Sequence, residues 1–194
     1  AHELNAKAEY SVVSRGRVEL LIEQKNLFIA CNTNPKWYIH SSETEWTEEL
    51  YPQIERLVSK KTVSDIRSAN GLKGKKIATV YGYSYPEVIS HLWYTNQAVR
   101  IQSLRLEAIM NRLLRNVSDV AIVSELEFSY WAEKNPISAA SLKLHPYIVS
   151  NIPTMCAVSE GSDFSAGDLN KAIDRLKANG KLNSILKRYR WRAR

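Results

Sequence analysis

The 194-residue sequence predicts an α/β fold in which a parallel-rich sheet carries helices on both faces. The main observation is that short apolar runs alternate with amphipathic helical runs between residues 76 and 135. Parallel strands need long crossover connections, and the crossover helices then cover both faces of the sheet. A second observation is that the apolar runs are continuous, as is typical of strands buried on both sides.

The elements of this alternation follow one another with short connections. Continuous apolar content predicts the strands, and apolar residues at helical spacing predict the helices. The expected strands are 76–81, 99–102 and 119–123, and the expected helices are 86–95, 104–116 and 125–135. The stripes are Val88, Ile89, Leu92 and Trp93 in one helix and Leu106, Ile109, Met110, Leu113 and Leu114 in the next.

The two ends of the chain have a different pattern. A helical run at 17–25 precedes an apolar strand at 27–31, and two helical segments lie within 165–189. Asn179 and Gly180 separate these two segments as a helix C-cap. Residues 51–61 are ambiguous between strand and helix periodicity, and residues 144–160 are expected to be a long extended stretch interrupted by Pro153.

The stretch after the strand at 76–81 is a candidate anion site. Gly82 interrupts the strand, Ser84 and Tyr85 are candidate caps, and Pro86 suits the first position of a helix. Such a junction leaves backbone N–H groups at the positive end of a helix dipole. The alternative is an ordinary tight connection without a ligand.

Composition excludes some classes of function. The net charge is +7, but six basic residues fall in the last fourteen positions, so we favour a solvated basic helix end and expect no nucleic acid. No apolar run approaches the ~20 residues of a spanning helix. The four histidines are scattered, and no phosphate loop, dinucleotide loop or nucleophile motif is present, so we expect no metal, no cofactor and no catalytic residue. Cys31 and Cys156 form either one disulfide or two buried thiols, and the sequence leaves both open.

Three stretches together resemble the periplasmic solute-binding proteins of ABC transporters, of the type II, amino-acid-binding kind. They are DIRSANGLKGKKIATVYGYSYPEV (65–88), LEAIMNRLLRNVSDVAIVSELEFSYWAEKN (106–135) and DLNKAIDRLKANGKLNSILKRY (168–189). The resemblance extends from about Leu4 onward. It implies a two-lobe fold joined by two hinge strands, with lobe 1 formed by 1–58 and 154–194 and lobe 2 by 60–150. It also implies a solute held between lobes that close on it by a hinge motion.

The resemblance further implies where the ligand binds in lobe 2. The loop Gly82, Tyr83, Ser84 and Tyr85 would hold the ligand's carboxylate. The family usually has an Asp after the strand at 119–123 that pairs with the α-amino group. This chain has Ser124 there with Glu125 beside it, and Glu125 is a candidate replacement.

In lobe 1 the family usually has an Arg shortly after the strand at 27–31. This chain has Asn34 and Trp37 in that region instead, so the bidentate contact that the family's Arg makes with the ligand's α-carboxylate is not expected here. Trp37 either stacks on the ligand or covers the core. Of Tyr83 and Tyr85, we expect one to line the site and the other to pack.

The family begins with a strand and a ligand loop that this chain lacks. The chain opens without a Met or a signal peptide, so we expect a processed or trimmed N-terminus. A shortened chain, a partly ordered one, and one that gains a strand from another chain by strand exchange would each account for the missing strand.

The expected function is therefore capture of a small amino-acid-like or carboxylate solute outside the cytoplasm, in the periplasm for a Gram-negative cell, without catalysis. Its partner would be a membrane permease of the ABC type or a fused signalling module. The alternative is an enzyme on the same scaffold, similar to cyclohexadienyl dehydratases, with Glu125 as the acid. A transcription regulator's effector domain is disfavoured because no helix-turn-helix is present.

Overall fold

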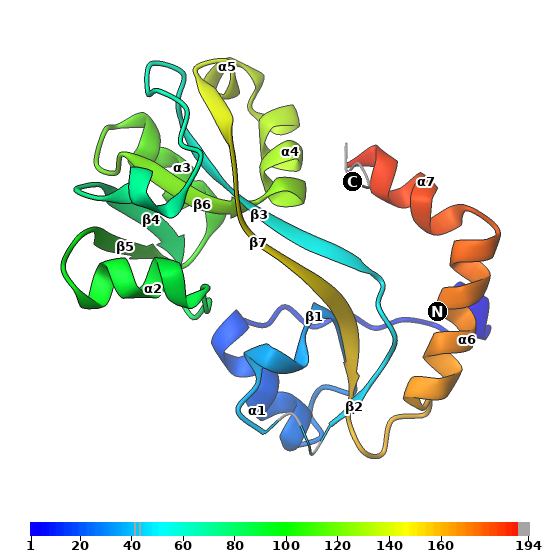
Figure 1. The fold of residues 1–194 in the computed structure, drawn as a ribbon. Helices are drawn as coiled ribbons and strands as arrows, with labels where there is room; N and C mark the ends of the chain where they lie inside the picture. Colours follow the sequence, from blue (N-terminus) through cyan, green and yellow to red (C-terminus); the bar gives the residue numbers. More distant parts are fainter. Residues whose placement is uncertain (41, 43, 190–194) are drawn as a thin grey trace. The chain divides into compact units, whose positions relative to one another are not determined.

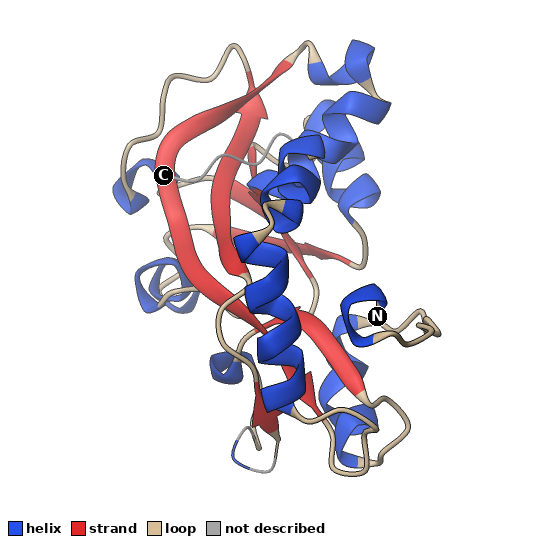
Figure 2. Ribbon diagram, turned by 90° about the vertical axis from the view of Figure 1, so that its right-hand side faces the viewer, coloured by secondary structure: helices blue, strands red, loops and turns tan. Residues whose placement is uncertain are grey.

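Two strands are longer than the others, and each contributes to both of the compact units into which the chain divides (Figure 1). They are β3 (Tyr51–Lys60) and β7 (Leu142–Val158), which Figure 2 also shows as long continuous strands. The computed structural model describes residues 1–40, 42 and 44–189. Unit 1 contains Ala1–Pro52 and Ile152–Arg188, and unit 2 contains Gln53–Asn151.

Unit 2 contains the predicted strand–helix alternation. The strands and helices begin and end close to the predicted positions because their local periodicity is strong. They are β4 (Lys76–Val80), α2 (Glu87–Tyr94), β5 (Val99–Ser103), α3 (Leu106–Leu114), β6 (Val120–Ser124) and α4 (Glu125–Lys134). Two short elements that the sequence did not predict are also present, the 3-10 helix η5 (Ala69–Leu72) before β4 and the helix α5 (Pro136–Ala139) after α4.

The strands of unit 2 lie in the order β7-β3-β6-β4-β5. Strand β4 is parallel to both β5 and β6, and Ala78 is paired with Ile101 on one side and with Ala121 on the other. Strand β3 is antiparallel to β6, with Leu57 opposite Ile122. The sheet is therefore mixed, with a parallel centre and the antiparallel strand β3 between that centre and β7.

Both faces of this sheet are buried, as the continuous apolar strands predict. One core contains Leu57, Ile77 and Ile122 with Ile89 and Leu92 of α2. The core on the opposite face is formed by the neighbouring strand residues and by α3 and α4. It contains Val58, Ala78, Ala121, Val123, Ile109, Met110, Leu113, Phe128 and Trp131.

The start of α2 differs from the prediction. Pro86 is the N-cap residue with ψ 149°, and its carbonyl accepts the first helical hydrogen bonds from Ile89 and Ser90. The helix therefore begins at Glu87, and no side chain caps it. Val88, predicted to belong to the apolar stripe, is 53% exposed because it lies in the first turn, away from the sheet.

Unit 1 contains shorter elements around the ends of the two long strands. They are the 3-10 helices η1 (His2–Leu4), η2 (Arg15–Arg17) and η3 (Pro35–Trp37), the helices α1 (Val18–Glu23), α6 (Ala166–Ala178) and α7 (Lys181–Arg188), and the strands β1 (Ile29–Thr33) and β2 (Glu45–Trp46). Gly180, with φ 72°, separates α6 from α7 as predicted. Among the described residues β1 pairs with β7 alone. Strand exchange, one of the three explanations offered for the missing strand, stays a prediction.

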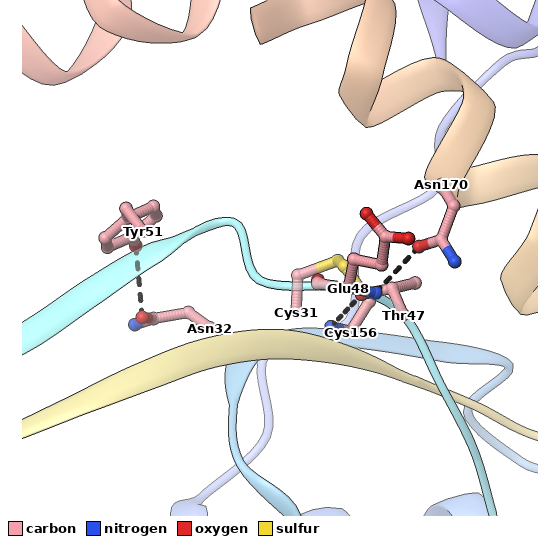
Figure 3. The surroundings of a disulfide bond; sticks show 7 residues. All are labelled: Cys31, Asn32, Thr47, Glu48, Tyr51, Cys156 and Asn170. Carbon is pink, nitrogen blue, oxygen red and sulfur yellow. Dashed lines mark hydrogen bonds between the residues drawn. A yellow bond between two sulfur atoms is a disulfide. The ribbon is translucent and has the colours of Figure 1, made fainter.

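A disulfide joins Cys31 of β1 to Cys156 of β7, which settles the question that the sequence left open (Figure 3). It lies at a bulge, since the register shifts between Ala30 and Thr33. Asn32 in this bulge has φ 59°, and its side chain accepts a 3.0 Å hydrogen bond from the Tyr51 hydroxyl. The disulfide therefore covalently ties two neighbouring antiparallel strands within unit 1.

The C-terminal basic stretch is described only in part, because residues 190–194 lie outside the described residues. Within the described part, no helix has both the length and the apolar character of a membrane-spanning segment.

Candidate functional site

The parallel strands β4 and β6 end at the same edge of the sheet of unit 2, and each is followed by a helix. Ligands of open α/β sheets bind at the carboxyl ends of strands. Two connections therefore form the candidate site: the β4 loop (Gly82–Tyr85) and the β6 junction (Ser124–Glu127).

The β4 loop begins with a tight turn. The N–H of Tyr83 donates to the carbonyl of Val80 at 3.4 Å, and Gly82, at the third position of this turn, has φ 79°. A positive φ at this position is the geometry of a type II turn, which strongly favours glycine. Gly82 is therefore required by the backbone, as the sequence suggested from its position at the end of the strand.

The carbonyl groups of the loop have partners within unit 2. The Tyr83 carbonyl accepts from the Arg100 guanidinium at 2.9 Å, and the Tyr85 carbonyl accepts from the Ser90 hydroxyl at 3.3 Å. By contrast, the N–H groups of Gly82, Ser84 and Tyr85 have no acceptor among the described residues. Gly82 and Ser84 are exposed. The loop thus presents backbone donors without competing acceptors, an arrangement suited to an anion.

A cluster of one cation and two aromatic rings lies behind the loop. The rings of Tyr85 and Trp93 are perpendicular, with centroids 5.5 Å apart. The Arg100 guanidinium carbon lies 5.2 Å from the Tyr85 centroid and 4.6 Å from that of Trp93. Tyr85 therefore packs inward, as we expected of one of the two tyrosines.

The first acidic residue of the β6 junction, Glu125, forms an ion pair inside the protein. Ser124 is the N-cap residue of α4 and is 6% exposed, although its side chain makes no capping hydrogen bond. Glu125 accepts a 2.6 Å hydrogen bond from the Arg56 guanidinium, and both side chains are mostly buried. A buried charge pair of this kind is a structural element of the junction.

The same arginine joins a second buried group. Arg56 donates through Nε and Nη2 to the His145 carbonyl. The His145 ring is fully buried, with Nδ1 accepting from the Ile66 N–H at 3.0 Å and Nε2 lying 2.7 Å from the Ser59 hydroxyl. Because Nδ1 accepts, we assign the hydrogen to Nε2, and burial lowers the pKa of this histidine.

A second buried carboxyl lies beside the β6 junction. Glu55 of β3 is opposite Ser124, is 5% exposed, and accepts from the Ser150 hydroxyl at 2.7 Å. Burial raises the pKa of Glu55 to about 7, helped by Glu127 and opposed by the Ser150 hydrogen bond. Desolvation also raises the pKa of Glu127, although its side chain is exposed and the Ser124 backbone opposes the shift.

Tyr85 connects the two parts of the site. Burial is the main reason why its pKa is raised, and the nearby Glu55 carboxyl raises it further. The candidate site thus has backbone donors and a cation at the β4 loop, and two carboxyls with raised pKa values on the side of the β6 junction.

The remaining predicted ligand residues, Asn34 and Trp37, belong to unit 1. The Asn34 amide caps η3 by accepting from the Lys36 N–H at 2.9 Å and donates to the Pro153 carbonyl at 2.7 Å. Asn34 is 3% exposed, and Trp37 ends η3 with a partly buried side chain. The polar atoms of Asn34 are therefore already used within unit 1.

Four residues at the site were not predicted: Arg100, Glu55, Ser150 and Glu127. For Glu127 a signal existed, since Ser124 and Glu127 have the S-x-x-E spacing of a capping box. Glu55 is a charged residue within an apolar strand, a second signal that could have been read as functional or structural. Within the described residues, no group of three or more His, Cys, Asp or Glu side chains could hold a metal ion.

Known proteins were compared with the chain by sequence and by structure. No protein-family model and no curated protein sequence matches it. Solved structures do match: an ancestral arginine-binding protein bound to arginine has a TM-score of 0.80 and 16% identity, over 97% of this chain and 82% of that one. The GluR0 ligand-binding core in complex with L-glutamate gives 0.80 and 18%, over 97% and 84%. An amino-acid ABC transporter substrate-binding protein from Streptococcus pneumoniae bound to L-arginine gives 0.78 and 18%, over 97% and 78%.

The chain has the periplasmic-binding fold. The fold class predicted from the sequence is thus confirmed. Identities of 16–18% show the fold alone, so what the chain binds has to be argued from its own residues. In this fold the candidate site lies in unit 2, at the carboxyl ends of β4 and β6.

Proposed function

We propose that this chain is an extracytoplasmic solute-binding domain that captures a small amino-acid-like solute. The observation that carries the proposal is the β4 loop, whose carbonyls at Tyr83 and Tyr85 have partners while the N–H groups of Gly82, Ser84 and Tyr85 have none among the described residues. Backbone donors at a strand end bind a carboxylate without further side chains. The β4 loop would hold the anionic end of the solute.

The other side of the site favours a solute that also carries an amino group or another donor. Glu55 and Glu127 both have raised pKa values, and the Glu127 carboxyl disfavours ionisation of Glu55. A ligand cation placed near them would compensate that repulsion. An α-amino acid carries both groups, a carboxylate for the β4 loop and an amino group for the acidic side.

The proteins of similar structure support this class of ligand. Those described above are bound to arginine or to L-glutamate, and one of them serves an amino-acid ABC transporter. We extend the amino-acid class to this chain, together with a role in ABC-type uptake or in sensing. Its partner would be a membrane permease or a fused signalling module.

The alternative of an enzyme with Glu125 as the acid finds no support at the β6 junction. The Glu125 carboxylate is engaged by Arg56 at 2.6 Å, so it is not a free acid facing a substrate. Ser124 and Glu125 remain predicted ligand residues, with the hydroxyl of Ser124 the better placed of the two because it has no capping role.

The test is a binding screen combined with a matched pair of glycine variants. L-Arginine, L-glutamine, L-glutamate and succinate are each titrated by calorimetry and by thermal unfolding. A solute at ~100 times its Kd should stabilise the fold by ~2.7 kcal/mol, which is roughly 5–10 °C for a domain of this size. If none of them, nor a wider amino-acid panel, shifts the unfolding temperature, the proposal is wrong.

The glycine variants locate the site. Gly82→Ala and Gly74→Ala both place a side chain at a positive φ, 79° and 75°, in the same unit. Both should cost about 1–2 kcal/mol of stability. Only Gly82→Ala should also weaken ligand binding, because only Gly82 shapes the β4 loop. Equal affinity in the two variants would move the ligand away from this loop.

A further inference from the structure

Arg100 of β5 is a cation at the β4 loop that has no acidic partner among the described residues. Its side chain is partly buried, and its Nε donates to the hydroxyl of Thr79 at 3.1 Å. In the part of the chain that the structure describes, every ion pair is formed by other residues. Because an arginine side chain is always charged, Arg100 gives the loop a positive charge that no carboxylate of the described residues pairs with.

The guanidinium contacts two residues of the loop. It donates to the Tyr83 carbonyl at 2.9 Å, and its carbon lies 5.2 Å from the ring centroid of Tyr85. Trp93 contributes a second ring, at 4.6 Å from the same carbon. Since Arg100 is anchored by Thr79 and by two rings, it holds the Tyr83 carbonyl in a fixed direction.

This arrangement has two consequences for a ligand. Turning the Tyr83 carbonyl inward keeps its partial negative charge away from the neighbouring N–H groups of Ser84 and Tyr85. In addition, the full positive charge beside the loop attracts an ionised ligand group more strongly than a neutral one. Backbone N–H groups alone discriminate less between the two.

We propose that Arg100 is the positioning residue that makes the β4 loop selective for a carboxylate over a neutral carbonyl group. This inference rests on the proposed function, since it assigns a role within the same site. The residue acts through the loop, by orienting Tyr83 and by its charge, and it need not touch the ligand.

The test compares an acid with its amide in three variants. The probes are L-arginine with L-argininamide, and L-glutamine with its α-carboxamide, and affinities are measured by calorimetry at one pH and salt concentration. Arg100→Met removes the charge and the hydrogen bonds, and Arg100→Lys keeps the charge without the planar fork. Arg112→Met is the matched control, because Arg112 is also partly buried in unit 2 and donates to the Ser103 hydroxyl at 2.9 Å.

In Arg100→Met the affinity for the acid should fall about tenfold or more, whereas that for the amide should fall by less than about threefold, so the preference for the acid is lost. Arg100→Lys should show an intermediate preference, and Arg112→Met should bind both probes like the wild type.

Other outcomes overturn the inference in distinguishable ways. An equal fall for acid and amide in Arg100→Met would show that Arg100 only supports the fold. If Arg100→Met does not fold, an acid-to-amide ratio in Arg100→Lys equal to that of the wild type would overturn it as well. A wild type that binds no amino acid at all would instead refute the proposed function, and this inference with it.

Discussion

The β4 loop and the β6 junction lie at the same edge of the sheet, yet they use their polar groups in opposite ways. At the β4 loop the carbonyls of Tyr83 and Tyr85 have donors within unit 2, whereas the N–H groups of Gly82, Ser84 and Tyr85 have no acceptor among the described residues. At the β6 junction the charged side chain of Glu125 is turned inward to a buried arginine. A strand end followed by a helix is therefore a place where a ligand site can form. Whether one forms depends on whether its polar groups point outward or are used inside the protein.

The comparison also assigns a polarity to the site. The positive charge of Arg100 lies at the β4 loop, whereas Glu55 and Glu127 form an acidic side whose pKa values are raised. A solute with both a carboxylate and an amino group matches both. The predictions below test each side of this contrast, beginning with the largest effect.

Arg56→Met should destabilise the protein by about 3–5 kcal/mol, because it leaves the buried Glu125 carboxylate and the His145 carbonyl without their donor. Urea denaturation followed by circular dichroism measures this. Arg67→Met is the control, since Arg67 is exposed and lies 3.7 Å from Asp65, a pair expected to contribute less than about 1 kcal/mol. A loss in Arg56→Met as small as that of the control would mean that the β6 junction is not a buried structural network.

Glu55→Gln should stabilise the protein in a pH-dependent way. The pKa of Glu55 is raised from 4.5 to about 7, so the folded state binds more protons than the unfolded state between these values. The stability of the wild type therefore decreases as pH rises through this window. Glutamine keeps an acceptor for Ser150 and cannot ionise, so the gain should be near zero at pH 4.5 and approach roughly 3 kcal/mol at pH 8.

Urea titrations at several pH values measure this difference, with Glu133→Gln as the exposed control. Subtracting the free energy of unfolding of the wild type from that of Glu55→Gln also removes the contribution of His145, whose lowered pKa makes stability rise with pH. A gain that does not depend on pH would show that Glu55 has the same pKa in the folded and unfolded states.

Much of the fold could be predicted because its signals are local. Continuous apolar strands and the helical stripe of α3 depend on neighbouring residues, and Ile109, Met110 and Leu113 are buried as predicted. Val88 shows the limit, since its exposure depends on where the helix starts relative to the sheet. The pairing of Cys31 with Cys156 depends on strand register over 125 residues, which no local pattern contains.

For the candidate site, the sequence indicated which strand ends to examine, but it did not show which side chains interact there. Gly82 could be found because its turn geometry requires glycine, whereas Arg100 could not, since the side of the sheet that a residue of a short strand faces is decided by tertiary packing. Glu125 was a candidate because the family resemblance implies an acid next to that position, but its partner Arg56 comes from a strand 69 residues earlier. The ligand roles of these residues stay predictions that the binding experiments test.

The smallest expected effect compares the two serines of the site. Ser84 is exposed and Ser124 is 6% exposed, and neither side chain caps a helix. Ser84→Ala should leave the unfolding temperature unchanged and weaken the binding of L-arginine by roughly threefold to tenfold, because it removes one hydroxyl donor to the carboxylate. It should weaken L-argininamide less. Ser124→Ala, on the acidic side, should affect acid and amide equally, since any contact it makes is with the other end of the solute. Calorimetry with both probes measures this, and the reverse pattern would place the carboxylate at the β6 junction and exchange the roles assigned to the two ends of the site.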